Sequence, residues 1–398
     1  MFRQIRVQQD DWDHQRILST DDNGQPIEYQ LTTVTYGTSC ALWLSLRVLK
    51  QLNIDEGHRF PLALPIFING RYVDDIYGAA ETEHQLEEII KQLINLCMAG
   101  GMPLQKWCSN VPHISKRLGL SSGSAPTIEF EESTVKVLGL CWQPEADTFH
   151  YKARNFNRDT ITKRVILSEI AQIYDPLGLI APVIVTAKIL IQELWLLKFN
   201  WDDQLPVAFM KCWQHFRPKL QQLSSQSLPR WLNLSLNTTD VQLHGVPDAS
   251  NLAMDTSVYL RASSATSGIT VTLICAKNKV ALLQKITIPW LELTAALLAT
   301  ELVAYVQRIL ELENIQVLLW SDSSVAITWI NGDPSRWKDF VQNRVLKTRD
   351  TLPSATWRHI NGKENPADCP SRDLSPKQLA EHHLWWTGPS WLVLPSDQ

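Results

Sequence analysis

The sequence predicts a mixed α/β fold (α+β) arranged in more than one domain. The chain has 398 residues, which is more than a single hydrophobic core usually serves. After residue 236, segments with the two-residue repeat of strands alternate with segments of helical period. Hydrophobic residues make up 44% of the chain and charged residues 20%, as is typical of globular proteins.

The net charge limits how a nucleic acid could bind, and the cysteines indicate the redox state of the compartment. The net charge is −4, so a nucleic acid would have to bind in a local groove rather than on a uniformly basic surface. The 7 cysteines are scattered without a Cys-x-x-Cys pair, which favours an intracellular, cytoplasmic protein without a disulfide framework or a zinc site. Lys188 and Glu193 interrupt the most apolar stretch, 177–197, so no membrane span is expected.

The N-terminal part predicts short strands and two helices. A Thr- and Val-rich run at 27–36 indicates a strand, and 40–52 has the apolar content of a mostly buried helix. The clearest helix is 82–99, where Thr82 and Gln85 have the spacing of a capping box.

A pair of adjacent aspartates, Asp74 and Asp75, lies in the segment Tyr-Val-Asp-Asp at 72–75. Asn69-Gly70 before it indicates a tight turn, and apolar residues on both sides place the pair between strands. Such a pair is costly to bury without cations; a surface turn is the alternative. Further on, a short strand around Lys106 and a strand at 135–142 are expected.

The middle of the chain predicts two helices and then a boundary. The helices are expected at 181–199 and 206–223, and Pro218 should kink the second. The Ser- and Pro-containing segment 224–230 has the composition of a linker. We therefore place the start of the next domain just after it.

The C-terminal part predicts three strands, a long helix, and then further strands and helices. Strands are expected at 241–248, 256–261, 269–283 with an interruption at 276–279, 315–320 and 356–360, and helices at 289–310, from Asp322 or Ser323 onward, and at 336–349. This succession is typical of a sheet with helices packed on it.

Four acidic residues of this part come from separate elements: Asp248, Glu292, Asp322 and Asp368. If they converge, they cannot all ionise unless cations neutralise them. Divalent cations with oxygen ligands, Mg²⁺ or Mn²⁺, suit such a site. The pattern therefore predicts a nuclease that holds two metal ions.

The N-terminal motifs resemble a known family. Tyr72 to Asp75, the helix after it, Lys106-Trp107 and Val137-Leu138-Gly139 resemble the palm of a reverse transcriptase, and Asp55–Pro61 resembles Bel/Pao-type LTR retrotransposon Pol polyproteins. The resemblance implies that Asp74 and Asp75 are metal-binding catalytic acids and that Lys106 contacts nucleic acid. The family's third aspartate has no matching position before Met1, so the resemblance implies a truncated palm with impaired polymerase activity.

The C-terminal motifs resemble the retrotransposon type of RNase H, with its five-stranded mixed sheet. The match lies in His244–Ser250, Ile288–Leu293, Trp320–Ser324 and Trp357–Arg372. It implies that Asp248 bridges two ions, that Glu292 and Asp322 hold the ion near the leaving group, and that Asp368 holds the ion near the nucleophile. Asn343 and Arg344 would brace or contact the nucleic acid.

The resemblance divides the chain into four parts. We expect a partial palm at 1–150, a helical thumb or connection at 151–235, an RNase H-like domain at 236–375 and a tail at 376–398 that leads towards an integrase region. The implied partners are RNA–DNA hybrid or primer/template nucleic acid and other Gag or Pol products of the element. A virus-like particle in the cytoplasm is the implied setting.

Three other interpretations were weighed against this one. A catalytically inactive remnant that only binds nucleic acid is the main alternative, because Pro247 and Asp255 depart from the family near Asp248. An integrase-type core would place its glutamate on a late helix and not at Glu292. An aspartic protease is rejected, because Asp255-Thr256-Ser257 lacks the required glycine.

Overall fold

The structure is a computed structural model. It describes residues 1–120, 135–137, 140–151, 155–156, 158–281, 283, 286–372 and 374–395. The chain forms two compact units, Met1–Ser133 and Thr134–Gln398, and each is considered by itself. Of the predicted motifs, Leu138 and Gly139 lie outside the described residues.

Three of the helices of the first unit, at 41–56, 63–69 and 83–99, pack around a small apolar core. Leu49, Phe67 and Leu96 are among its buried residues. Gly70 ends the second helix where a Cβ atom would lie 1.9 Å from the carbonyl oxygen of Tyr77, so this close approach requires glycine. The elements are β1 (Arg16–Thr20), β2 (Pro26–Gln30), α1 (Ala41–Glu56), α2 (Ala63–Asn69), β3 (Arg71–Tyr72), β4 (Asp75–Ile76), α3 (Glu83–Ala99) and α4 (Pro112–Arg117).

Several predictions for this unit are confirmed and others are wrong. Thr82 caps α3 by accepting from the amide of Gln85, but the Gln85 side chain accepts from Glu81 instead of completing the box at Thr82. The strand expected before Asn69-Gly70 is wrong: α2 occupies it, because Ala63 and Phe67 are buried one helical turn apart. The strand expected around Lys106 is also wrong, since Lys106 has a φ of 58°.

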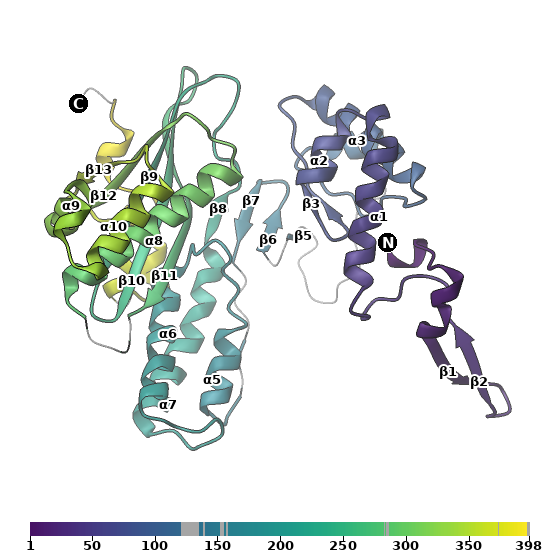
Figure 1. The fold of residues 1–398 in the computed structure, drawn as a ribbon, viewed down its shortest axis with the longest axis horizontal. Coiled ribbons are helices and arrows are strands. Elements are labelled where there is room, and N and C mark those ends of the chain that lie inside the picture. Colours follow the sequence, from purple (N-terminus) through teal and green to yellow (C-terminus); the bar gives the residue numbers. More distant parts are fainter. Residues whose placement is uncertain are drawn as a thin grey trace. The chain divides into compact units, whose positions relative to one another are not determined.

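The second unit is organised around a five-stranded mixed sheet in the order β11-β10-β9-β12-β13 (Figure 1). The first three strands are antiparallel, and β12 runs parallel to both β9 and β13. The predicted succession is confirmed, except that β11 continues through the expected interruption. The elements are β9 (Thr238–Ala249), β10 (Ala253–Ser264), β11 (Gly268–Val280), α8 (Ile288–Ile309), β12 (Gln316–Ser321), α9 (Ser324–Asn331), α10 (Asp339–Thr351) and β13 (Thr356–His359).

Helix α8 packs on one face of this sheet at very close range. At Gly245 of β9, a Cβ atom would lie 2.5 Å from Leu319 and 2.7 Å from Val303 of α8, so the strand needs glycine there. By length and composition alone, α8 could cross a membrane. It packs against β9, β10 and α10 as the core helix of a globular domain does, so this is weak evidence for a span.

The described part of the middle region has three helices, and one of them, α6, packs on the opposite face near β11. The three are α5 (Lys163–Ile170), α6 (Ala181–Leu196) and α7 (Val207–Phe216). The chain enters α6 beside β11: the amide of Ala276 donates to Leu177 at 2.7 Å, and a Cβ at Gly178 would lie 1.8 Å from the Ala276 carbonyl oxygen. The predicted break at Pro218 is confirmed, because α7 ends at Phe216 and a 3-10 helix follows.

A smaller sheet and the C-terminal tail also belong to this unit. The sheet has the order β5-β6-β7-β8, and its last strand occupies part of the segment predicted as a domain boundary. The strand predicted at 135–142 divides into two antiparallel strands. The elements are β5 (Val135–Val137), β6 (Leu140–Gln143), β7 (Thr148–His150), β8 (Ser227–Pro229), α11 (Pro376–Ala380) and α12 (His383–Thr387).

The tail is anchored to three parts of the unit that are distant in sequence. The indole of Trp385, 1% exposed, donates to the carbonyl of Leu179 at 2.9 Å. The hydroxyl of Tyr259 on β10 donates to the carbonyl of Trp385 at 2.7 Å. Trp391 packs on Trp320 of β12, with ring centroids 4.5 Å apart. The middle region, the sheet and the tail therefore share one core.

Candidate functional site

The site begins where two parallel strands end side by side. Strands β9 and β12 pair in register, with Leu319 opposite Gly245, so their carboxyl ends lie at the same edge of the sheet. Asp248 stands near the end of β9, and Asp322 directly follows β12. This is the edge where ligands bind in open α/β sheets.

Glu292 reaches the same edge from the start of α8. The hydroxyl of Ser323 donates a short hydrogen bond to the Glu292 carboxylate, and the same Ser323 oxygen accepts from the amide of Ala326 at 3.2 Å. Ser323 is therefore both the N-cap of α9 and the group that orients Glu292. Sequence analysis predicted the cap but missed the bond to Glu292, which depends on a contact 31 residues away.

Asp368 is held near β9 by its own segment, a 3-10 helix at Pro366–Arg372. The side-chain amide of Asn365 donates to the carbonyl of Pro247 at 3.2 Å, and its oxygen accepts from the amide of Ala367 at 2.9 Å. Asn365 is 1% exposed. It therefore ties the segment that carries Asp368 to the residue just before Asp248.

The charges of these acids act on one another. Burial, followed by the charges of Asp322, Asp368 and Glu292, raises the pKa of Asp248 to about 7. Burial and the charge of Asp368 raise the pKa of Asp322, and burial and Asp322 raise that of Glu292, against the hydrogen bond from Ser323. The structure thus brings the predicted acids close enough to repel one another.

The donor set fits divalent cations in its chemistry. Carboxylate oxygens are the ligands that Mg²⁺ and Mn²⁺ prefer, and acids that repel one another can all ionise only beside positive charge. Within the described residues, no three acidic, histidine or cysteine side chains already have the spacing that would hold an ion. The acids therefore lie near one another without having the spacing of a formed cation site.

A fifth acid, Asp255, lies directly beside Asp248. The two residues are opposite each other on β10 and β9. Asp255 is 2% exposed, and its Oδ1 atom has no hydrogen-bond partner within the described part of the chain. Burial and the charge of Asp248 raise its pKa well above the ordinary value, whereas the charge of Lys188 acts in the opposite direction.

The acids predicted in the first unit have a different environment. Asp74 and Asp75 lie at the hairpin of β3 and β4, and both are exposed. The hydroxyl of Tyr77 donates to the Asp75 carboxylate at 3.3 Å, and Val73 has a φ of 56°. The structure therefore has the alternative that the sequence offered for this pair, a surface turn. Lys106 is exposed as well.

Of the two residues predicted to brace or contact nucleic acid, one is a brace. The guanidinium of Arg344 stacks 3.4 Å from the centroid of Phe340 and donates to Thr294 of α8 at 3.1 Å. Burial lowers its pKa. Phe340 also stacks on Trp290, 4.2 Å away. Asn343, by contrast, is exposed on α10 and is free to meet a ligand.

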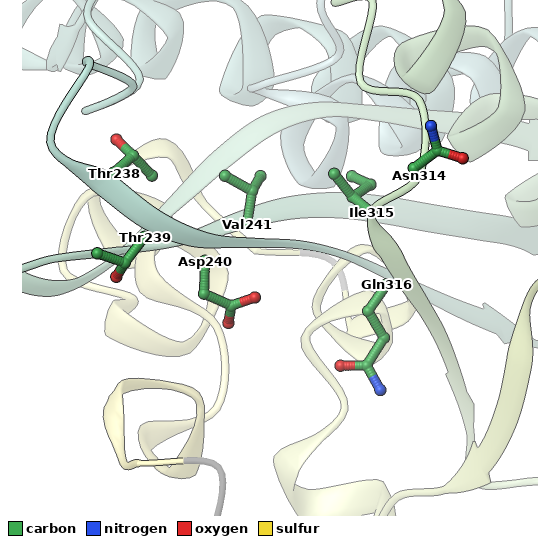
Figure 2. A pocket seen from close by; sticks show the side chains of 7 residues that line it. All are labelled: Thr238, Thr239, Asp240, Val241, Asn314, Ile315 and Gln316. Carbon is green, nitrogen blue, oxygen red and sulfur yellow. The ribbon is translucent and has the colours of Figure 1, made fainter.

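A hollow of about 270 Å³ lies elsewhere on this sheet (Figure 2). It is at the beginning of β9 and β12, whereas the acids are at the ends of these strands. Its lining is Thr238, Thr239, Asp240, Val241, Asn314, Ile315 and Gln316. Because none of the four predicted acids lines this hollow, we assign it no part in the site.

Comparison with known proteins agrees with the fold. Residues 162–323 match the family described as the Pao retrotransposon-like RNaseH-like domain. The predicted kinship with Pao-type retrotransposon Pol proteins is confirmed by this match, which runs from the middle helices through β12. The predicted α/β class with a five-stranded mixed sheet is confirmed as well. No curated protein matches the chain.

Solved structures give weaker likenesses. RNase H1 of the archaeon Halobacterium salinarum NRC-1 is 13% identical over 32% of this chain and 91% of its own, with a TM-score of 0.22. The foamy viral protease-reverse transcriptase in complex with RNA/DNA hybrid is 13% identical over 91% of this chain, with a TM-score of 0.47. This chain covers 43% of that viral protein.

Proposed function

We propose that this chain hydrolyses the RNA strand of RNA–DNA hybrids and that it does so with two divalent cations, Mg²⁺ or Mn²⁺. The observation that carries the proposal is the placement of Asp248, Glu292, Asp322 and Asp368 at one edge of the sheet, where burial and the other three charges raise the pKa of Asp248. Mutual repulsion of this kind is relieved by cations. The match to a retrotransposon RNase H-like family supports the same reading.

The residues divide the work as follows. Asp248 would bridge the ions, Glu292 and Asp322 would hold the one near the leaving group, and Asp368 the one near the nucleophile. When bound, such ions activate water and stabilise the leaving 3′ oxygen. The Ser323 hydroxyl fixes the direction of the Glu292 carboxylate, and Asn365 fixes the Asp368 segment against β9. The 2′-hydroxyl groups of the RNA strand would distinguish a hybrid from duplex DNA.

We propose hydrolysis rather than polymerisation as the activity of this chain. The Asp74–Asp75 pair is exposed at the turn between β3 and β4, whereas the four acids of the second unit lie at one edge of its sheet. Nucleotide transfer with two ions needs a carboxylate shared between them. Other Gag or Pol products of the element are its proposed partners, in a virus-like particle in the cytoplasm.

A second candidate is a protein that binds nucleic acid without cutting it. The open spacing of the acids and the crowding of Asp248 by Asp255 favour this candidate. The two proposals differ in turnover and not in binding.

The test is cleavage of a hybrid whose RNA strand is end-labelled, by the full chain with Mg²⁺ or Mn²⁺ and with a chelator as control. We expect RNA fragments with either ion, no cleavage with the chelator, and an intact DNA duplex. A chain that retards the hybrid in a gel but leaves the RNA uncut at millimolar Mn²⁺ would establish the second candidate.

A further inference from the structure

A row of polar side chains crosses the sheet beside the candidate site. Asp255 on β10 lies opposite Asp248 on β9 on one side and Asn278 on β11 on the other. Directly opposed residues of antiparallel strands point to the same face of a sheet. Asp248, Asp255 and Asn278 therefore share the face that α6 covers.

The middle of this row is electrostatically costly. Asp255 is 2% exposed with one carboxylate oxygen unpartnered in the described part of the chain. A buried carboxylate needs a nearby positive charge or a proton. Without either, Asp255 would repel Asp248 across the strands. With a proton shared between the two, Asp248 would lose a lone pair that a cation needs.

A positive charge reaches this row from outside the sheet. The ammonium of Lys188 on α6 donates a short hydrogen bond to the side-chain oxygen of Asn278. The Asn278 amide donates to the carbonyl of Ala181 at 2.8 Å, and Gln192 donates to the carbonyl of Ala281 at 2.6 Å. Helix α6 is thus fixed to the edge strand at several points, and the place of the Lys188 ammonium is fixed with it.

Asn278, the hydrogen-bond partner of Lys188, stands directly opposite Asp255, so the bond places Lys188 near Asp255. Burial lowers the pKa of Lys188, and the charges of Asp175 and Asp255 act to raise it. Asp175 has other partners, because its carboxylate accepts from the amides of Leu179 and Ile180 at the start of α6. Of these two carboxylates, that of Asp255 has an oxygen without a hydrogen-bond partner among the described residues.

We propose that Lys188 is a positioning residue of the nuclease site: its ammonium offsets the charge of Asp255 and so leaves Asp248 free to bind cations. The inference rests on the proposed function and deepens it. It makes α6 part of the site, although α6 contributes none of the four predicted acids. It also explains how an aspartate can stand beside Asp248 without disabling it.

The test is Mn²⁺ binding to the full chain, followed by the electron paramagnetic resonance signal of the free ion. We expect Lys188→Met to weaken Mn²⁺ binding at least tenfold, with hybrid cleavage falling in parallel and KM for the hybrid unchanged. In the double variant Lys188→Met/Asp255→Asn, binding should return to within about threefold of the unaltered chain. Lys198→Met, which removes an exposed lysine just after the same helix, is the matched control and should change nothing.

Each other outcome overturns the inference. Lys188→Met with unchanged or tighter Mn²⁺ binding would show that its charge is not needed. A double variant as weak as Lys188→Met alone would show that Lys188 does not act through Asp255. Loss of bound Mn²⁺ in Asp255→Asn alone would make Asp255 a ligand.

Folding provides a second measurement. If Lys188→Met fails to fold, recovery of its thermal transition by Asp255→Asn supports the same charge pairing, and absence of recovery overturns it. The proposed function fails separately: an unaltered chain that binds Mn²⁺ through Asp248 but leaves the hybrid uncut would refute hydrolysis while the positioning role of Lys188 stands.

Discussion

Two pairs of neighbouring aspartates, one in each unit, differ in their burial. Asp74 and Asp75 are adjacent in sequence and exposed. Asp248 and Asp255 are adjacent only across two strands, and burial raises the pKa of both. Adjacency in sequence therefore creates no demand for cations by itself. Burial among other acids creates such a demand, because water no longer screens the negative charges from one another.

The largest effect that separates the two regions should come from removing one acid in each. Asp248→Asn should lower hybrid cleavage by roughly a thousandfold, because cation-based stabilisation is worth several kcal/mol and 1.4 kcal/mol is a factor of ten. Asp74→Asn should leave cleavage within about twofold. The measurement is the initial rate of RNA cleavage at saturating Mg²⁺.

The same variants separate catalysis from folding. Asp248→Asn removes a charge that the folded state disfavours, so it should not lower the thermal midpoint of the metal-free protein. Equal loss of cleavage in Asp74→Asn and Asp248→Asn would break the comparison and return the first unit to the active machinery.

The next effect contrasts a buried tryptophan of the second unit with an exposed tryptophan of the first. Trp385→Ala should lower the free energy of unfolding by about 3 kcal/mol or more, as large-to-small changes in a core do, because Trp385 is buried and bonded to Leu179. Trp43 is 65% exposed, so Trp43→Ala should change the free energy of unfolding by less than about 0.5 kcal/mol. Urea unfolding followed by circular dichroism measures both. A stable Trp385→Ala chain would show that the tail is dispensable.

Local patterns made the second unit largely predictable from sequence. The alternation of β9 and β10, the apolar period of α8 and the cap at Ser323 each depend on a few consecutive residues. Asp248, Glu292 and Asp322 stand near the end or beginning of such elements, and the resemblance to RNase H supplied the roles of all four acids. The interruption expected within β11 was wrong, because pairing with β10 on a buried edge overrides local polarity.

Contacts between distant segments could not be predicted. The sequence presents Lys188 as a break in an apolar run and as a solvated or phosphate-binding lysine, whereas its partner Asn278 is 90 residues away. The anchoring of Trp385 spans 206 residues. In the first unit, Asn69-Gly70 predicts a tight turn between strand residues, although burial of Ala63 and Phe67 makes the run before it a helix. Packing decided each of these cases.

A smaller effect concerns the pH dependence of stability. The pKa of Asp248 rises from 3.8 in the unfolded chain to about 7 in the metal-free folded protein, so the folded state binds more protons between these values. Stability from this group is present below about pH 4 and is lost as the pH rises to about 7. Relative to Asp248→Asn, the unaltered chain should lose on the order of 4 kcal/mol between pH 4 and 8. Urea unfolding at both pH values measures the difference.

Magnesium provides the control for that measurement. At pH 8, millimolar Mg²⁺ should restore stability to the unaltered chain, because an ion that binds only the folded state stabilises it. Asp248→Asn should gain little. A gain of the same size in both chains would mean that the ion binds away from Asp248.

The smallest effect separates two adjacent residues of α10. Arg344→Ala should cost about 1 kcal/mol of stability, because it removes the stack on Phe340 and the bond to Thr294. Asn343 is exposed, so Asn343→Ala should leave stability within about 0.5 kcal/mol. If its amide contacts the hybrid, one lost hydrogen bond raises the Kd about fivefold. Gel retardation with the uncut hybrid in calcium measures this, and an unchanged Kd would remove Asn343 from the binding surface.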